Sequence, residues 1–151
     1  MFKNDFLSVN FVQQVKKLKG DEAPNWGVLS AQGMIEHMTE SVAIAYGKIK
    51  QPLTTAPELL EKMKAFAMSD KEFKPNTKNV LMSESPAPLV FSNITDAISD
   101  FEKEINAFHN YYKTNTGAII TNPFFGDLNY EEWQHLLNKH ALHHLKQYNL
   151  A

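Results

Sequence analysis

The chain has 151 residues, with 15 Lys or Arg against 17 Asp or Glu, and contains no cysteine. This length predicts one domain over residues 1–151 with a core of its own, and the near balance of charge argues against a nucleic-acid or anionic-membrane partner. The absence of cysteine excludes disulfides, thiolate ligands and a cysteine nucleophile, so His, Asp and Glu are the candidate metal ligands.

The first half of the chain contains three amphipathic segments. Apolar residues recur at helical spacing over residues 7–18, and Gly20 follows where a C-cap glycine would lie. Ser30 is a plausible N-cap for a second helix over 30–48, which has a long apolar stripe. A third helix is expected over 57–68, because a proline at its first position favours helix initiation.

The second half begins with an irregular stretch over residues 71–89, rich in proline and without periodicity. Such a length predicts either a segment that wraps the body or covers an opening, or a mobile surface excursion. The next helix is expected over 92–113, capped by Ser92 or Asn93, since apolar residues repeat at three and four positions over five turns. A turn-rich connection then leads to the last helix.

The last helix is expected over 130–148. Asn129 is a good N-cap, and Glu132 three positions later completes a capping box. At about 100° per residue, one stripe of this helix carries Trp133, Leu137, His140 and His144. Two histidines therefore point toward the core, one turn apart.

All periodic segments have the helical repeat, and no alternating strand pattern is longer than four residues. We therefore expect an all-α fold in which the helices pack on one another. The predicted architecture is a four-helix bundle built from 30–48, 57–68, 92–113 and 130–148, with the short N-terminal helix as an addition.

Buried histidines need hydrogen bonds or a metal to offset their desolvation. His140 and His144 could therefore reach one ion together, or they could be core histidines bonded to the backbone and to each other. His37 lies on the flank of its helical stripe, where a lone histidine is more often structural than a ligand. His135 is expected to be solvated and His143 to lie at the rim of a cavity.

Several motifs in order along the chain resemble those of the DinB-like (YfiT-like) metalloenzymes, from about Trp26 to Gln147. They are Trp26-Gly27, Met34-Ile35-Glu36-His37-Met38, Asn122-Pro-x-Phe-Gly126, Trp133 and His140-x-x-His143-His144-x-x-Gln147. The closer similarity is to a branch labelled a domain of unknown function. Relatives in that branch often have His-Pro where this chain has Asn122-Pro123. Any function of that histidine in the relatives is therefore absent from this chain.

The resemblance implies a four-helix bundle that holds a divalent metal, usually zinc or nickel, through His37, His140 and His144. Three histidines would leave a coordination position for water or substrate, as in catalytic zinc sites. The residue after His140 is alanine, so the H-E-x-x-H arrangement with its glutamate base is absent. His143 is the candidate for proton transfer or for supporting the ligands.

Three functions remain open. Family analogy implies a metal-dependent transferase that uses a low-molecular-weight thiol, whereas a hydrolase using metal-activated water and a non-catalytic ligand-binding or stress-associated bundle are the alternatives. A small, partly apolar substrate is expected, because Met34, Met38, Trp133 and Leu137 neighbour the ligands on their helices. We expect a cytoplasmic protein with no membrane or nucleic-acid partner, and we leave open a homodimer.

Overall fold

The computed structural model describes residues 5–75 and 88–151, and this part of the chain is mostly helical. Its elements, in chain order, are η1 (Phe6–Phe11, a π-helical stretch), α1 (Val12–Val15), α2 (Ala31–Ala45), α3 (Pro57–Met68), α4 (Ile94–Thr114), β1 (Ile120–Asn122), β2 (Gly126–Leu128) and α5 (Tyr130–Gln147). None of the helices among these described residues is long and apolar enough to cross a membrane.

The predicted helix starts are confirmed. Ser30, Asn93 and Asn129 cap α2, α4 and α5, each through a side-chain oxygen that accepts a backbone N–H of the first turn. Asn129 and Glu132 form the expected capping box, with reciprocal bonds of 2.9 and 3.0 Å. Pro57 is the first residue of α3. Local capping chemistry therefore fixes where these helices begin.

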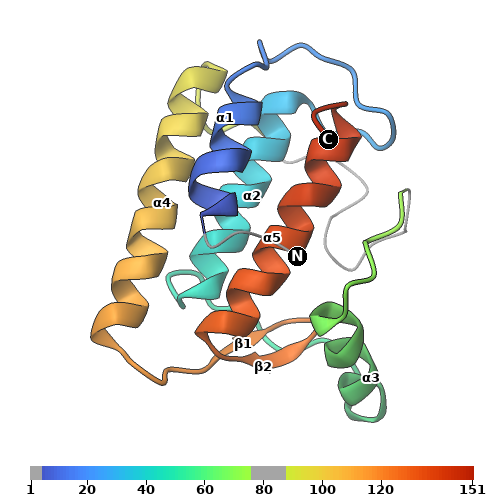
Figure 1. The fold of residues 1–151 in the computed structure, drawn as a ribbon, viewed down its shortest axis with the longest axis vertical. Helices are drawn as coiled ribbons and strands as arrows, with labels where there is room; N and C mark the ends of the chain where they lie inside the picture. Colours follow the sequence, from blue (N-terminus) through green and yellow to red (C-terminus); the bar gives the residue numbers. More distant parts are fainter. Residues whose placement is uncertain (1–4, 76–87) are drawn as a thin grey trace.

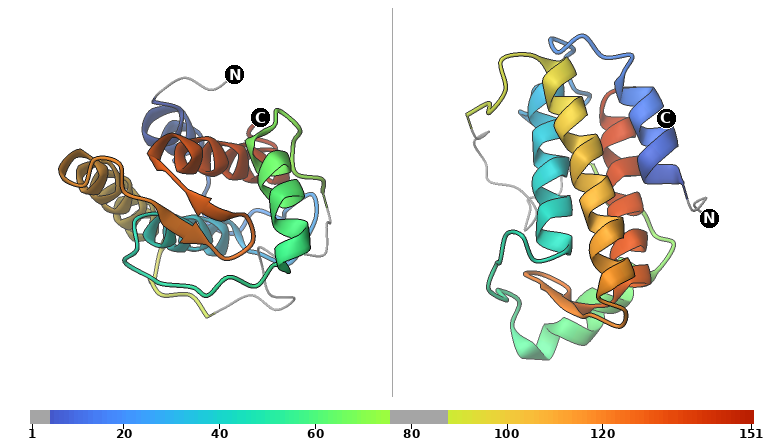
Figure 2. Two further views of the ribbon diagram at one scale, coloured as in Figure 1. Left: turned by 90° about the horizontal axis from the view of Figure 1, so that it is seen from below. Right: turned by 90° about the vertical axis from the view of Figure 1, so that its left-hand side faces the viewer.

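The segment η1–α1 lies beside α5 and α4, and α2 packs on the same two helices, whereas α3 lies across one end, as Figures 1 and 2 show. The expected four-helix bundle that includes α3 is therefore not confirmed. Ala67 is the buried residue of α3, and Leu59 remains 52% exposed. Met63 and Phe66 are partly buried against the core, so the apolar face of α3 packs as predicted, but at one end of the molecule instead of along the other helices.

The prediction of an all-α chain also missed a two-stranded antiparallel hairpin, β1–β2, in which Ile120 pairs with Leu128. Its turn is stabilised by Asn122, whose Oδ1 accepts the backbone N–H groups of Phe124 and Phe125 at 2.8 and 3.0 Å. The indole N–H of Trp133 donates to the Ile120 carbonyl at 3.1 Å. The hairpin thereby closes the end of the core beside the start of α5.

Aromatic and aliphatic side chains from η1, α2, α4 and α5 form the core. Phe11 and Phe101 pack with ring centroids 5.2 Å apart, and both are fully buried. Met34 and Met38 are likewise fully buried. Both methionines belong to the core, and neither lines the large pocket described below. The prediction that they flank a small-molecule substrate is therefore wrong.

The stretch predicted to be irregular, 71–89, is described in part. Residues 71–75 follow α3 and lie near α5, while 76–87 fall outside the described residues. The described parts of the stretch pack on the body of the protein: residues 71–75 contact α5 through Phe73, and Pro88 lines a large pocket.

Candidate metal centre

Three histidines from two helices meet between α2 and α5. The Nε2 atom of His140 lies 3.1 Å from His37 Nε2 and 2.9 Å from His144 Nε2. One ring nitrogen from each histidine lies within 4.8 Å of the others, an arrangement that could hold a metal ion. The three residues predicted as ligands are thus brought together, although His37 and His140 are far apart in sequence.

Burial keeps these imidazoles neutral. The side chains of His140 and His144 are 5% and 1% exposed. Burial lowers the pKa of His37 to about 4, with His143 adding to the shift, and lowers the pKa of His140 and His144 well below the ordinary value. A neutral imidazole has one nitrogen with a free lone pair, which is the form that binds a metal.

The three histidines have too few protons to hydrogen-bond with one another at every close contact, which suits a bound cation. His144 Nδ1 lies 2.7 Å from Gln147 Oε1, so Nδ1 carries the proton and Nε2 can only accept. His140 Nε2 has one proton at most, which cannot serve both of its close nitrogen neighbours. A divalent ion at the meeting point would engage all three lone pairs at once. The residues present therefore fit the metal that the motifs imply.

A pocket of ≈ 950 Å³ lies beside the cluster. His37 and His140 line it, together with the apolar side chains Trp133 and Leu137, whose expected place near the ligands is confirmed. His144 is 1% exposed and is not among the residues that line this pocket. A small molecule in this pocket could thus approach the cluster from the His37 and His140 side.

His143 lies on a different side of α5 from the large pocket. It lines a second pocket of ≈ 290 Å³ with Trp26 and Phe73. Its ring packs on Trp26 at 5.2 Å between centroids, and its Nδ1 lies 3.3 Å from the Phe73 carbonyl oxygen. Its rim position is as expected, but its catalytic role stays a prediction, because it does not line the pocket that reaches His37 and His140.

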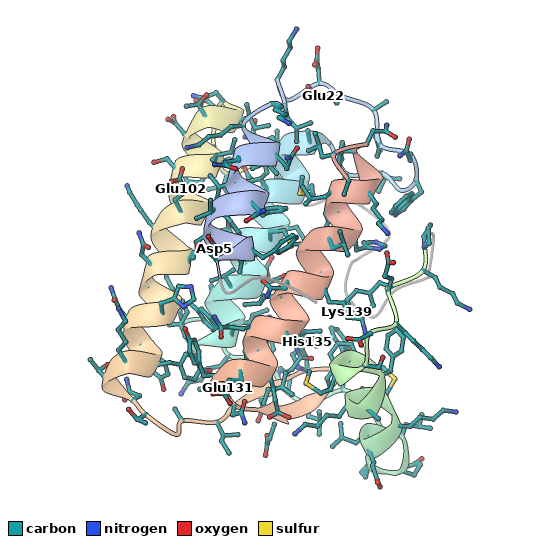
Figure 3. All side chains as sticks on the ribbon, viewed as in Figure 1. Asp5, Glu22, Glu102, Glu131, His135 and Lys139 are labelled. Carbon is teal, nitrogen blue, oxygen red and sulfur yellow. The ribbon has the colours of Figure 1, made fainter. Side chains whose placement is uncertain are left out.

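A second row of polar residues on α5, which we call the outer stripe, consists of His135, Lys139, His143 and Lys146. Its members contact the chain from the end of α3 to Phe73, and Figure 3 labels His135 and Lys139 on the side of α5 that faces it. The contacts are His135 Nε2 to the Ser69 carbonyl at 3.1 Å, Lys139 Nζ to the Phe66 carbonyl at 2.7 Å, His143 Nδ1 to the Phe73 carbonyl, and an ion pair between Lys146 and Glu72.

The outer stripe corrects one prediction and adds one residue. His135 is partly buried and contacts a carbonyl, whereas the sequence predicted a solvated side chain. Lys139, which sequence reasoning missed, is 4% exposed with its ammonium 4.2 Å from the Phe66 ring centroid. A charged residue in the middle of an amphipathic helix gave no signal of burial, because its partners are carbonyls of a distant segment.

Gln147 is the last residue of the His140-x-x-His143-His144-x-x-Gln147 motif, and the sequence predicted no role for it. It is 2% exposed and bridges His144 to the Trp26 carbonyl. Its position one turn after His144, on the same side of α5, was the available signal.

Comparison with known proteins gave no match: no family model, no curated protein and no solved structure is significantly similar to this chain. The DinB-like resemblance therefore rests on the motifs in the sequence, and the geometry of the three histidines stands independently of it.

Proposed function

We propose that this chain is a divalent-metal-dependent enzyme of the DinB-like kind, in which His37, His140 and His144 hold the ion and a small molecule binds in the adjacent pocket. The observation that carries the proposal is the meeting of three neutral imidazole nitrogens at the wall of a pocket of ≈ 950 Å³. The four-helix-bundle fold is part of the proposal, with η1–α1, α2, α4 and α5 as its helices.

The ligand set favours a catalytic ion over a structural one. Structural zinc sites are generally closed by four protein ligands, whereas catalytic sites have three and leave a position for water or substrate. The candidate ligands in the described part of the chain number three, all neutral, so the full charge of the ion would act on whatever binds next to it. A bound divalent ion would lower the pKa of a thiol or water and polarise a substrate oxygen.

Side chains of the pocket would bind and orient the substrate. Trp133 and Leu137 offer an apolar wall, and Lys48, which is salt-bridged to Glu104 at 2.6 Å, supplies a cation on the lining. Glu36 accepts the backbone N–H groups of Val90 and Phe91, so its carboxylate is engaged in holding that segment.

Glu40, one turn after His37 on α2, is exposed and lines the same pocket. It is therefore better placed than His143 to accept a proton from a thiol or water in the pocket. The specific reaction we propose is attack of a low-molecular-weight thiol on a small electrophilic substrate, with zinc or nickel as the metal. The S–H proton passes to Glu40, a carbon–sulfur bond forms, and the bond from that carbon to the substrate's leaving group breaks. The choice of a thiol rests on the family resemblance. The apolar side chains of Trp133 and Leu137 in the lining are compatible with a small, partly apolar substrate.

Two measurements test this function. Protein purified without a histidine tag is analysed for metal content, and a crystal is examined by anomalous scattering to define the coordination sphere. An ion on His37, His140 and His144 with an exchangeable fourth position is the expected result. Absence of any ion after exposure to zinc and nickel, or a fourth protein ligand that closes the site, would overturn the catalytic proposal.

Assays of the metal-loaded protein then distinguish the reactions. A rate that saturates with a small thiol and falls in Glu40→Gln supports the transferase. A thiol-independent hydrolysis of esters or amides that needs the metal would replace it with the hydrolase. A metal-bound protein with neither activity would indicate the non-catalytic, ligand-binding alternative.

A further inference from the structure

We propose that Gln147 is a positioning residue that fixes the tautomer of His144, and that the connector 25–27 before α2 controls the metal centre by holding Gln147 in place. The proposal deepens the proposed function and rests on it for its metal-binding consequence. It concerns residues that lie outside the three candidate ligands.

The orientation of the Gln147 amide is set by its two neighbours. Its Nε2 lies 2.8 Å from the carbonyl oxygen of Trp26, and its Oε1 lies 2.7 Å from His144 Nδ1. A backbone carbonyl can only accept a hydrogen bond, so the NH₂ group must face Trp26. The amide oxygen then faces His144 and requires a proton on Nδ1. The Trp26 carbonyl thus fixes the orientation of the Gln147 amide, and that orientation in turn fixes the tautomer of His144.

This tautomer directs a lone pair at the other histidines. With its proton on Nδ1, His144 has an unprotonated Nε2, which is the atom 2.9 Å from His140 Nε2. Partners of this kind orient ligating histidines and raise their basicity. Without the Gln147 oxygen, Nε2 protonation would compete, and that form cannot donate a lone pair to an ion at the cluster.

Asn25 attaches the connector to the last turn of α5 through its backbone and its side chain. The N–H of Asn25 donates to the Gln147 carbonyl at 2.7 Å, and the Asn25 side chain donates to the Lys146 carbonyl at 3.0 Å. Gly27 has φ +81°, and a Cβ at this position would lie 3.1 Å from Gln147 Nε2. The close approach of the amide to the main chain therefore depends on glycine at position 27.

The consequence is that residue 27, which is not one of the three candidate ligands, influences the metal site. A side chain at position 27 would be strained by the positive φ and would press on the amide that orients His144. We expect such a change to weaken metal binding through Gln147.

The test uses zinc titrations and histidine ¹⁵N NMR on the full chain, with Gln147→Leu, Gln147→Glu and Gly27→Ala as variants. Gln147→Leu is expected to bind zinc about 10–100-fold more weakly, the usual effect of losing such a partner. Gln147→Glu retains an acceptor for His144 Nδ1 but loses the N–H that donates to the Trp26 carbonyl. It is therefore expected to keep the Nδ1 tautomer and to recover only part of the zinc affinity. Gly27→Ala should fall between the wild type and Gln147→Leu. Gln134→Leu, a partly buried glutamine on the same helix, is the matched control and should bind as the wild type does.

The NMR measurement is made on metal-free protein, so it stands even if the proposed enzyme function fails. The wild type and Gln147→Glu should show His144 protonated on Nδ1, and Gln147→Leu a mixture of tautomers. An unchanged tautomer and unchanged zinc affinity in Gln147→Leu would overturn the inference. If Gln147→Leu does not fold, Gln147→Glu decides: a His144 protonated on Nε2 in that variant would contradict the proposal. A wild type that binds no zinc yet shows the Nδ1 tautomer would refute the metal function and preserve the role of Gln147.

Discussion

The sharpest test of the metal centre is the loss of metal-dependent stabilisation in His140→Ala. His140 Nε2 is the atom that contacts both other histidines, so its removal takes away the central member of the cluster. The change also alters the metal-free protein, because a nearly buried ring is lost. The informative quantity is therefore the difference in melting temperature with and without zinc, measured separately for each variant.

The expected size follows from linkage. At a free zinc concentration of about 100 times the dissociation constant, binding adds about 2.7 kcal/mol to the free energy of unfolding. For a chain of this length, about 2–4 °C per kcal/mol gives a rise of about 5–11 °C. If losing one of three ligands weakens binding about a hundredfold, the same zinc concentration adds only about 0.4 kcal/mol, or about 1–2 °C.

The assay is differential scanning calorimetry or fluorimetry of tag-free protein, stripped of metal and titrated with zinc. His135→Ala is the control, because His135 belongs to the outer stripe and contacts the Ser69 carbonyl instead of the cluster. It should retain the full zinc-dependent rise. Equal rises in His140→Ala and His135→Ala would refute the assignment of the metal to this cluster.

Three further predictions concern stability. Asn129→Ala should lower the free energy of unfolding by about 1 kcal/mol, seen as a lower urea midpoint, because the capping box of α5 is lost; an unchanged midpoint would contradict this role. Phe101→Ala should cost about 3–5 kcal/mol in the same measurement, since the ring is fully buried, and a loss below about 1 kcal/mol would refute its place in the core. The metal-free protein should lose stability as pH falls below about 6.5. The folded-state pKa values of His37, His140 and His144 are lowered, so the unfolded chain binds more protons than the folded one in this pH range. A urea midpoint independent of pH between 7.5 and 5.5 would contradict this prediction.

The sequence predicted those parts of the fold that depend on local chemistry. The starts of α2, α4 and α5 follow from side-chain caps within the first turn, which spacing alone identifies. The position of α3 does not follow from its own periodicity, because its packing depends on the rest of the molecule. The hairpin β1–β2 was missed because strands of three residues are too short to display an alternating pattern.

The candidate site was predicted through a local signal combined with a resemblance. The spacing of His140 and His144 on one helical face is visible in the sequence, whereas the approach of His37 depends on the packing of α2 against α5. The bridge from His144 through Gln147 to the Trp26 carbonyl could not be derived from the sequence, because one of its partners is a main-chain atom of a distant connector. Lys139 was missed for the same reason.

The ligand histidines and the outer stripe make contacts on different sides of α5, and together they fix the rotation of the helix about its axis. His140 and His144 face the cluster, while His135, Lys139 and His143 face the carbonyls that follow α3, about 100° away around the axis. Deleting one residue after the Asn129 cap would turn everything beyond it by that angle. Ala141 and Leu145 would then occupy the places of the two ligands, and the histidines would move to the positions of Lys139 and His143. Natural variants of this protein should therefore contain no single-residue insertion or deletion between Asn129 and His144.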